Sequence, residues 1–464
     1  MLSDRTSSHS SRLALLVGLA GVGVGIVAGF LAGAKPLLLL LALIAVPTLI
    51  FFFARFEQAV LGLLIVRSAL DVFSAQQIPA AFGIGLILLT LLYVTIRLLT
   101  GQAVRTDWFC WFFTAWIILQ GLWLILLPLG ALGLDASFLP MSIRDWMRTL
   151  LWPVVYWLVM QLKGRIYPEK AISLLFLSAI APFTVASMQL FVPPSFVPFL
   201  LSTDERIKGT FAHPNVFATY LLLFIALTCW KLERSHKHWP WLLLLGVLAF
   251  FFVSTRALFS LAMLVTFVLG LLAPRLSLPK LIGGAVLLLL VIGLFVSTEF
   301  GQERLLSLTN TPLLNPDIDI SRAILLSQGD HNSFNWRISQ WDYLLRAWQQ
   351  FPMFGYGIGL SIPVAGNGLL PHNDYVRALV EGGVVGLVSF LTLFGAMFLR
   401  LIQLLRYAPS GSAQQQLCLI LLAFIPAILV GMITENIWSH TTLFFYLSAL
   451  LAIAGWNWNE PRIT

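Results

Sequence analysis

Charged residues are scarce in this chain. Asp, Glu, Lys and Arg make up 10% of its 464 residues, whereas a soluble domain carries about 25%. Hydrophobic residues make up 59%, and this balance predicts a membrane protein with many spans. No charged, linker-like stretch is long enough to separate soluble domains, so we expect a single integral membrane domain over residues 1–464.

Cysteine is also scarce, and its positions indicate no chemistry. Cys110, Cys229 and Cys418 all fall in apolar runs, which supports neither a disulfide framework nor a metal cluster. No closely spaced pair of acidic residues indicates a metal site, and the sequence predicts no cofactor. The formal charge of +8 does not predict a nucleic-acid partner, because Lys and Arg lie in short loops where the positive-inside bias explains many of them.

Apolar runs fill most of the chain. A helix needs about 20 apolar residues to cross a bilayer. Runs long enough to cross occur at about 13–33, 36–54, 81–99, 108–129, 146–162, 171–192, 214–230, 280–298, 384–401, 417–433 and 442–457, with shorter candidates at about 57–72, 241–254 and 257–273. They predict an all-α polytopic bundle of about 12–14 transmembrane helices. The first run is too long for a signal-peptide core, so we expect an uncleaved span there.

Basic residues predict the orientation of the bundle. With the N-terminus in the cytoplasm, most Lys and Arg fall in inner loops, and the C-terminus is also cytoplasmic. The one long polar segment, residues 299–375, then lies outside, in the periplasm of a cell that has one. It is far longer than an ordinary helix connection. We therefore expect the chemistry of this inner-membrane protein in this large periplasmic loop.

The loop contains one predicted amphipathic helix, from Asn335 to Phe351, which Pro352 ends. Four apolar residues fall on one face at i, i+3, i+4 and i+7, namely Trp341, Leu344, Leu345 and Trp348. A tryptophan-rich face is typical of a helix that lies at the membrane interface. Packing on a small core within the loop explains the pattern equally well.

Five basic residues do not follow the positive-inside bias and fall on the outer side: Arg206, Lys208, Arg256, Arg337 and Arg377. Basic residues on the disfavoured side indicate an anionic ligand, and guanidinium groups match phosphate well. Arg256 follows a run of only about 20 Å as a helix, so it is expected below the outer surface, where a charge is costly unless functional. Snorkelling to the interface, or pairing with Glu435, are the alternatives.

Two histidines occupy positions where chemistry is conceivable. His372 ends the long loop, and an outer-face histidine can accept a proton from a hydroxyl; the alternative is a helix-start residue with no chemical role. His213 precedes Pro214 and Asn215 at the start of another apolar run, where helix capping is a sufficient explanation. Residues 355–359 look like a phosphate-binding loop, but without a preceding strand they predict a flexible turn.

Six segments occur in a defined order along the chain: residues 209–215 (GTFAHPN), 254–256 (STR), 335–337 (NWR), 351–357 (FPMFGYG), 371–375 (PHNDY) and 381–383 (EGG). This ordered set resembles the O-antigen ligase and O-antigen polymerase superfamily of bacterial membrane glycosyltransferases. The similarity covers roughly residues 200–405. Each segment alone is weak, whereas the ordered set is fairly specific.

The resemblance implies a bundle of about a dozen helices and a metal-independent, inverting transfer of a glycan from undecaprenyl pyrophosphate to an acceptor hydroxyl. By that likeness His372 is the general base, and Arg256 and Arg206 hold the pyrophosphate, with Lys208 competing for the place of Arg206. Arg337 would support either the bound phosphate or the long loop. Further support residues are expected among His213, Asn215, Asn373, Asp374, Arg377 and Glu435.

The resemblance leaves the acceptor open. A ligase would use a lipid A core sugar, a polymerase would extend lipid-linked repeat units, and a third type would glycosylate protein. We favour the ligase. A lipid-linked glycan transporter is the alternative from a different class, but inverted repeats and midplane charges, which transporters favour, are missing from the sequence.

Overall fold

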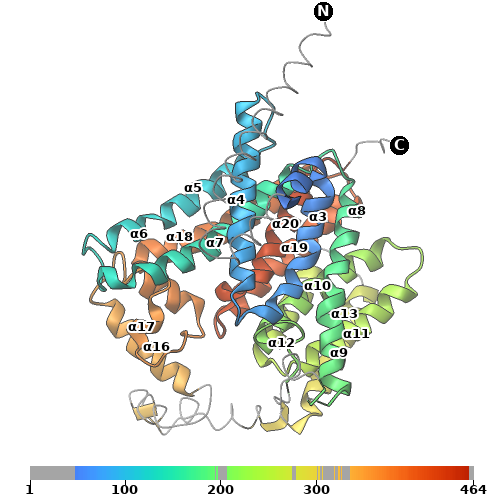
Figure 1. The fold of residues 1–464 in the computed structure, drawn as a ribbon. Helices are drawn as coiled ribbons and strands as arrows, with labels where there is room; N and C mark the ends of the chain where they lie inside the picture. The colour runs from blue at the N-terminus through green and yellow to red at the C-terminus, as the bar shows by residue number, and fades with distance from the viewer. Residues whose placement is uncertain are drawn as a thin grey trace, which may run out of the picture.

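The computed structural model describes residues 47–193, 195–196, 206–273, 278–299 and 335–458, with a few more between 301 and 326. Across these residues the protein contains helices and no strand (Figure 1), which confirms the predicted all-α class. Six helices are long and apolar enough to cross a membrane, and a bent pair, Pro47–Ala54 with Phe56–Phe73, would make a seventh. The chain is therefore a multi-pass membrane protein.

The first half of the described chain begins with the helix Pro47–Ala54 and contains ten further helical elements. They are α3 (Phe56–Val66), η1 (Arg67–Phe73), α4 (Ile78–Leu99), α5 (Trp108–Gln120), α6 (Leu122–Leu126), η2 (Ala136–Phe138), α7 (Leu139–Met160), α8 (Pro168–Leu175), η3 (Phe176–Ala179) and α9 (Ile180–Phe191), where η marks a 3₁₀ helix.

The second half carries most of the predicted site. Its elements are α10 (Pro214–Arg234), α11 (Trp239–Ser254), α12 (Leu258–Leu272), α13 (Leu278–Val296), α16 (Asn335–Trp348), α17 (Ser361–Ala365), α18 (Asp374–Tyr407), α19 (Ala413–Gly431), η5 (Ile437–Ser439) and α20 (Thr441–Ala454). In Figure 1, α16 and α17 lie close to the start of α18, which both contact.

The number of long helices is smaller than the predicted 12–14 spans. Four apolar runs form shorter helices, among them α11 with 16 residues and α12 with 15. A 16-residue helix is about 24 Å long, short of the roughly 30 Å hydrocarbon core. The predicted span at 13–33 lies outside the described residues. Short helices end inside the bundle, and the sharp reversal between α11 and α12 contains Arg256.

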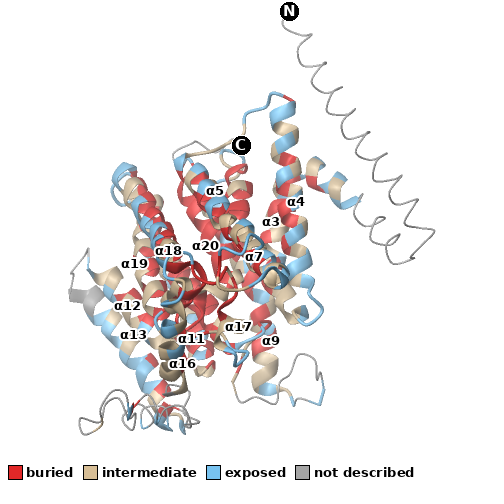
Figure 2. Cartoon of the chain, turned by 90° about the vertical axis from the view of Figure 1, so that its left-hand side faces the viewer, coloured by how far each residue is buried: buried red, intermediate tan, exposed pale blue. Residues whose placement is uncertain are grey.

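The core of the bundle is built on α10, α19 and α20. All 14 residues of α20 except Thr441 are buried, and α10 is buried along most of its length. Helices that are apolar on every side are expected in the interior of a membrane bundle. Figure 2 shows the buried residues concentrated around α20. The loops at the starts of α10 and α20 are thereby held rigidly.

A glycine kink divides α18. Gly383 has φ 65° and ψ −162°, which only glycine adopts readily. The kink exposes backbone groups to the segment before α17: the Val384 N–H donates to the Pro352 carbonyl at 2.9 Å, and the Tyr356 N–H donates to the Val380 carbonyl at 2.9 Å. The segment 355–359 therefore packs against α18, and the predicted turn is confirmed, whereas its flexibility stays a prediction.

Substituting Gly383 with alanine should destabilise the fold. A Cβ at this position would lie 2.2 Å from the Met353 carbonyl oxygen, and the positive φ alone costs about 1–3 kcal/mol. Thermal unfolding of the purified protein should show a clear loss. The matched control is Gly395→Ala in the same helix, where a Cβ meets nothing within 4 Å and should be neutral or stabilising. Equal melting temperatures for the two variants would contradict this reading of the kink.

Candidate active site

His372 lies at the end of the loop, two residues before α18 begins. Its backbone is in the left-handed region, with φ 52°. Its N–H donates to Asn436 Oδ1 at 2.8 Å, and its ring meets the Trp336 ring edge-on at 5.7 Å. The side chain is 21% exposed. A strained residue held from several sides, and still accessible, is typical of a functional position.

Glu435 is the direct partner of this histidine. Its Oε1 lies 3.2 Å from His372 Nδ1, and its side chain is 5% exposed. Burial alone would raise the pKa of Glu435, but the hydrogen bond and charge of His372, with His440 and Arg337, lower it to about 2. The carboxylate is therefore ionised and accepts only, so Nδ1 carries the proton. In the neutral ring Nε2 is left as the proton acceptor.

The other oxygen of Glu435 connects the histidine to the start of α10. Glu435 Oε2 accepts a hydrogen bond from Asn215 Nδ2. Asn215 Oδ1 accepts in turn from Arg206 Nη2 at 2.8 Å. His213 is the N-cap of α10, and its Nδ1 accepts from the Asn215 N–H at 3.1 Å. The sequence prediction of a helix cap at His213 is thus confirmed, and Asn215 joins two predicted site residues.

Arg206 also reaches the reversal between α11 and α12. Its Nε donates to the Thr255 carbonyl at 3.0 Å, and Thr255 is followed directly by Arg256. Arg256 has φ 51° and is one of three non-glycine residues with positive φ in the described chain, together with Gln77 and His372. The structure therefore brings together Arg206, the Arg256 reversal and His372. Pairing of Arg256 with Glu435 stays a prediction.

Four helices begin around these residues. His213, Asn373 and His440 are the N-caps of α10, α18 and α20, and Arg256 and His372 stand immediately before the N-caps of α12 and α18. Hydrogen bonds link these four helix starts, including the one between Thr219 Oγ1 and His440 Nδ1 at 3.0 Å. Each helix N-terminus carries roughly half a positive charge. Several of them at one place, beside arginines, favour an anion.

The long loop reaches the site through α16. Arg337 Nη1 donates to the Thr434 carbonyl at 3.1 Å, one residue before Glu435. Trp341 Nε1 donates to the Pro371 carbonyl at 2.5 Å, one residue before His372. These contacts fit the predicted loop-support role of Arg337. They also show that part of the tryptophan face of α16 packs on the loop itself.

Lys208 is held by its backbone rather than by its side chain. Its N–H and that of Gly209 both donate to Gln189 Oε1 at 2.9 Å. Thr210 then donates to the Ser68 carbonyl at 2.7 Å. The segment that carries Arg206 is thereby clamped from two sides. Arg206 makes the contacts to Asn215 and Thr255 described above. These contacts favour Arg206 over Lys208 as the second arginine or lysine that the resemblance assigns to the pyrophosphate.

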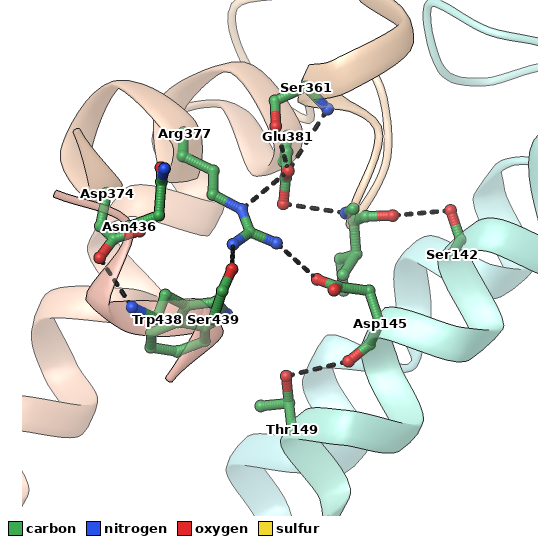
Figure 3. A network of polar contacts seen from close by, with 12 residues as sticks. Ser142, Asp145, Thr149, Ser361, Asp374, Arg377, Glu381, Asn436, Trp438 and Ser439 are labelled. Carbon is green, nitrogen blue, oxygen red and sulfur yellow. Dashed lines mark hydrogen bonds and ion pairs between the residues drawn. The ribbon is translucent and has the colours of Figure 1, made fainter. Parts of the chain in front are cut away.

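A second polar network lies one turn into α18 (Figure 3). Arg377 is 3% exposed and donates to Glu381 Oε1 at 3.0 Å, to Asp145 Oδ2 at 2.7 Å and to Ser439 Oγ at 2.7 Å. Glu381 also accepts from the Ser361 hydroxyl at 2.6 Å. The guanidinium is neutralised by two carboxylates. Its place therefore fits a supporting role in the framework rather than contact with an anionic ligand.

Asn373 and Asp374 complete this framework. Asn373 Oδ1 caps α18 by accepting from the Tyr375 and Val376 N–H groups at 3.0 Å. Asp374 is buried, and its Oδ2 accepts from the Trp438 N–H at 2.8 Å. Asp374 thus holds the first turn of α18, which Asn373 caps, against the segment 435–439. That segment presents Glu435 to His372 on one side and Ser439 to Arg377 on the other.

Sequence reasoning missed three residues of the site region. Asn436 fixes the His372 backbone, Asp145 pairs with Arg377 from a helix 232 positions earlier, and His440 bonds to Thr219. Burial lowers the pKa of His440 to about 4 despite the opposing effect of Glu435, so it is neutral. The signal for Asn436 was its place beside Glu435 in a polar gap between two apolar runs.

The described residues contain no group of three or more His, Cys, Asp or Glu that could hold a metal ion. The groups available for chemistry in the site are an oriented imidazole, a buried carboxylate and arginines close to helix starts.

Comparison with known families gives one match. Residues 241–391 match the profile of the family described as O-antigen ligase. The matched range includes Arg256, the loop helix α16, His372 and the first half of α18. It ends before Glu435 and begins after Arg206 and Asn215. No curated protein matches the chain.

Proposed function

Residues 241–391 form an O-antigen ligase family domain, and on that premise we propose that this membrane glycosyltransferase moves a glycan from undecaprenyl pyrophosphate to an acceptor hydroxyl. The enzyme is of the ligase or polymerase type. We assign it the ligase reaction, with a lipid A core sugar as acceptor. We place the site on the periplasmic face of the inner membrane, with both termini in the cytoplasm.

The observation that carries the proposal is the His372–Glu435 pair. With Nδ1–H donated to Glu435, Nε2 of His372 is free to accept the proton of the acceptor hydroxyl. The acceptor oxygen attacks the anomeric carbon as the bond from that carbon to the pyrophosphate oxygen breaks. The electron pair leaves with the pyrophosphate, the proton stays on His372, and the anomeric centre is inverted. Glu435 stabilises the imidazolium that forms.

Arg206 and Arg256 supply the other half of the reaction. Pyrophosphate is already a good leaving group, so the enzyme needs chiefly to stabilise its charge and position the acceptor. Arg206, which bonds to Asn215 in the first turn of α10, and Arg256, two residues before α12, are half-buried, where electrostatic interactions are stronger than in water. The helix N-termini add fixed positive potential at the same place. No resident metal enters the proposed steps.

Substituting Glu435 with glutamine should slow transfer by roughly 10- to 100-fold, the effect of removing a hydrogen bond to a charged group. The amide cannot stabilise the imidazolium that forms as His372 takes up the acceptor proton. Single-turnover rates at one fixed pH measure the loss. Glu57→Gln, at a carboxylate that is 43% exposed, is the matched control. An unchanged rate in Glu435→Gln would exclude this partnership.

Chelation should leave the activity unchanged. The proposed charge stabilisation comes from arginines and helix termini, which EDTA does not remove. Transfer assayed before and after EDTA treatment, with Mg²⁺ restored in a parallel sample, measures this directly. Loss of activity that Mg²⁺ restores would contradict the metal-independent mechanism.

The acceptor is tested by product size. Purified protein is incubated with an undecaprenyl-pyrophosphate glycan, with and without lipid A core. Transfer that requires the core supports the ligase reaction. A ladder of longer lipid-linked chains without the core supports the runner-up, a polymerase. Transfer to an added acceptor protein would support the third alternative, a protein glycosyltransferase.

A further inference from the structure

Four side chains form one continuous chain of hydrogen bonds across the site. Arg206 Nη2 donates to Asn215 Oδ1 at 2.8 Å, Asn215 Nδ2 donates to Glu435 Oε2, and Glu435 Oε1 lies 3.2 Å from His372 Nδ1. The Asn215–Glu435 contact joins residues 220 positions apart. The chain therefore connects the arginine assigned to the pyrophosphate with the histidine assigned to the acceptor.

An asparagine side chain suits the central place in this series of hydrogen bonds. Asparagine accepts with its oxygen and donates with its nitrogen at the same time, so it bridges a cation and an anion. It carries no net charge itself, and the bridge leaves both partners ionised. A direct ion pair between Arg206 and Glu435 would instead tie the two charges to each other. Glu435 can thus keep its charge for His372.

The amide is also held in place. Asn215 is buried, it follows Pro214 in the first turn of α10, and its N–H is capped by His213 Nδ1. Glu435 accepts in addition from the Asn436 N–H at 3.1 Å. A displacement of Arg206 therefore moves a rigidly seated amide or breaks its bond, and either change alters the carboxylate that orients His372.

We propose that Asn215 is a positioning residue that couples binding of the lipid pyrophosphate at Arg206 to the orientation of the His372 imidazole. The inference rests on the proposed function and deepens it, because it makes the base responsive to the donor. Coupling of this kind is reciprocal, so the state of the His372–Glu435 pair also affects donor affinity. A water-exposed base would then be correctly oriented mainly when donor is present.

The test uses the reactivity of His372 itself. Diethyl pyrocarbonate modifies neutral imidazoles, and His372 is partly exposed. The full-length protein is treated with the reagent with and without undecaprenyl pyrophosphate, a probe that lacks glycan and acceptor. Modification of His372 is quantified by peptide mass spectrometry, and the exposed His236 serves as internal reference. We expect the probe to change the His372 rate about fivefold or more, the lower end of typical coupling.

Asn215→Asp breaks the series of hydrogen bonds at one place, between residue 215 and Glu435. The aspartate still accepts from Arg206 but cannot donate to Glu435, so the probe should bind while the His372 rate no longer responds. The matched control is Asn436→Asp, which adds the same charge beside Glu435 and keeps an oxygen for the His372 N–H. This control should keep the response. Should Asn215→Asp not fold, Asn215→Leu offers Arg206 no acceptor and Glu435 no donor, leaves Arg206 in place to bind the probe, and should also lose the response.

Each outcome is decisive. A response in Asn215→Asp equal to that of the unchanged protein would overturn the coupling and indicate simple shielding of His372 by the lipid. A bound probe without any response in the unchanged protein would overturn it as well. If the unchanged protein does not bind undecaprenyl pyrophosphate at all, the donor assignment itself fails, and the coupling falls with it.

Discussion

Replacing His372 with alanine should reduce glycan transfer by at least about 100-fold, since a positioned general base contributes roughly 10²–10⁴ to a rate. The remaining activity would come from the arginines and from positioning of the two substrates. The ring contributes contacts to Glu435 and Trp336, whereas the backbone bond to Asn436 stays. We therefore expect the variant to insert and fold, and donor affinity to change only through the proposed coupling between Arg206 and the His372–Glu435 pair.

The measurement is single-turnover transfer with saturating donor, alongside a thermal unfolding curve for each variant. His236→Ala removes an exposed histidine at the start of α11 and should behave like the unchanged protein. Full turnover in His372→Ala would remove His372 from the base role. The site would then need another proton acceptor, and the network contains a second, buried and neutral ring in His440.

Replacing Arg256 with alanine should weaken binding of the lipid pyrophosphate by roughly 10- to 100-fold, the loss of one or two charge-assisted hydrogen bonds. Arg256→Lys should recover only part of this loss, because an ammonium cannot make the bidentate contact of a guanidinium. The positive φ of Arg256 remains in both variants, so the comparison isolates the side chain.

Donor affinity is measured with undecaprenyl pyrophosphate in detergent at fixed ionic strength. Arg346→Ala is the control, because Arg346 lies on α16 in the long loop, is 75% exposed and pairs with Asp342 at 2.9 Å. It should change affinity by less than about twofold, as expected for a surface pair. Unchanged affinity in Arg256→Ala would move the donor site away from the α11–α12 reversal.

The local pattern of apolar residues was enough to predict the all-α fold class. Apolar runs are read within windows of about 20 residues, so the sequence predicted helices at α4, α10, α18 and α19. It predicted the short α11 before Arg256 for the same reason. The number of spans was less predictable, because several apolar runs form helices of only 14–16 residues, which are shorter than a full span.

The sequence predicted several residues of the site, but not the hydrogen bonds and ion pairs that connect them. His372, Arg206 and Arg256 stood out as polar residues where a membrane protein can place few of them. Their roles remain predictions. From the sequence, Asn215 was interpreted as part of a helix start. Nothing in the neighbouring residues indicated that its side chain joins Arg206 to Glu435. Arg377 read as an outer-face cation, whereas tertiary structure surrounds it with Asp145 and Glu381.

The sequence by itself determined that this protein is a helical membrane protein with one long polar region, because hydropathy and charge act over a few turns of chain. Tertiary structure alone decided which polar groups meet. The bonds that define the site join Asn215 to Glu435, Glu435 to His372 and Arg377 to Asp145, over separations of 220, 63 and 232 residues. Such contacts depend on how the helices pack, and packing sums weak interactions over the whole bundle.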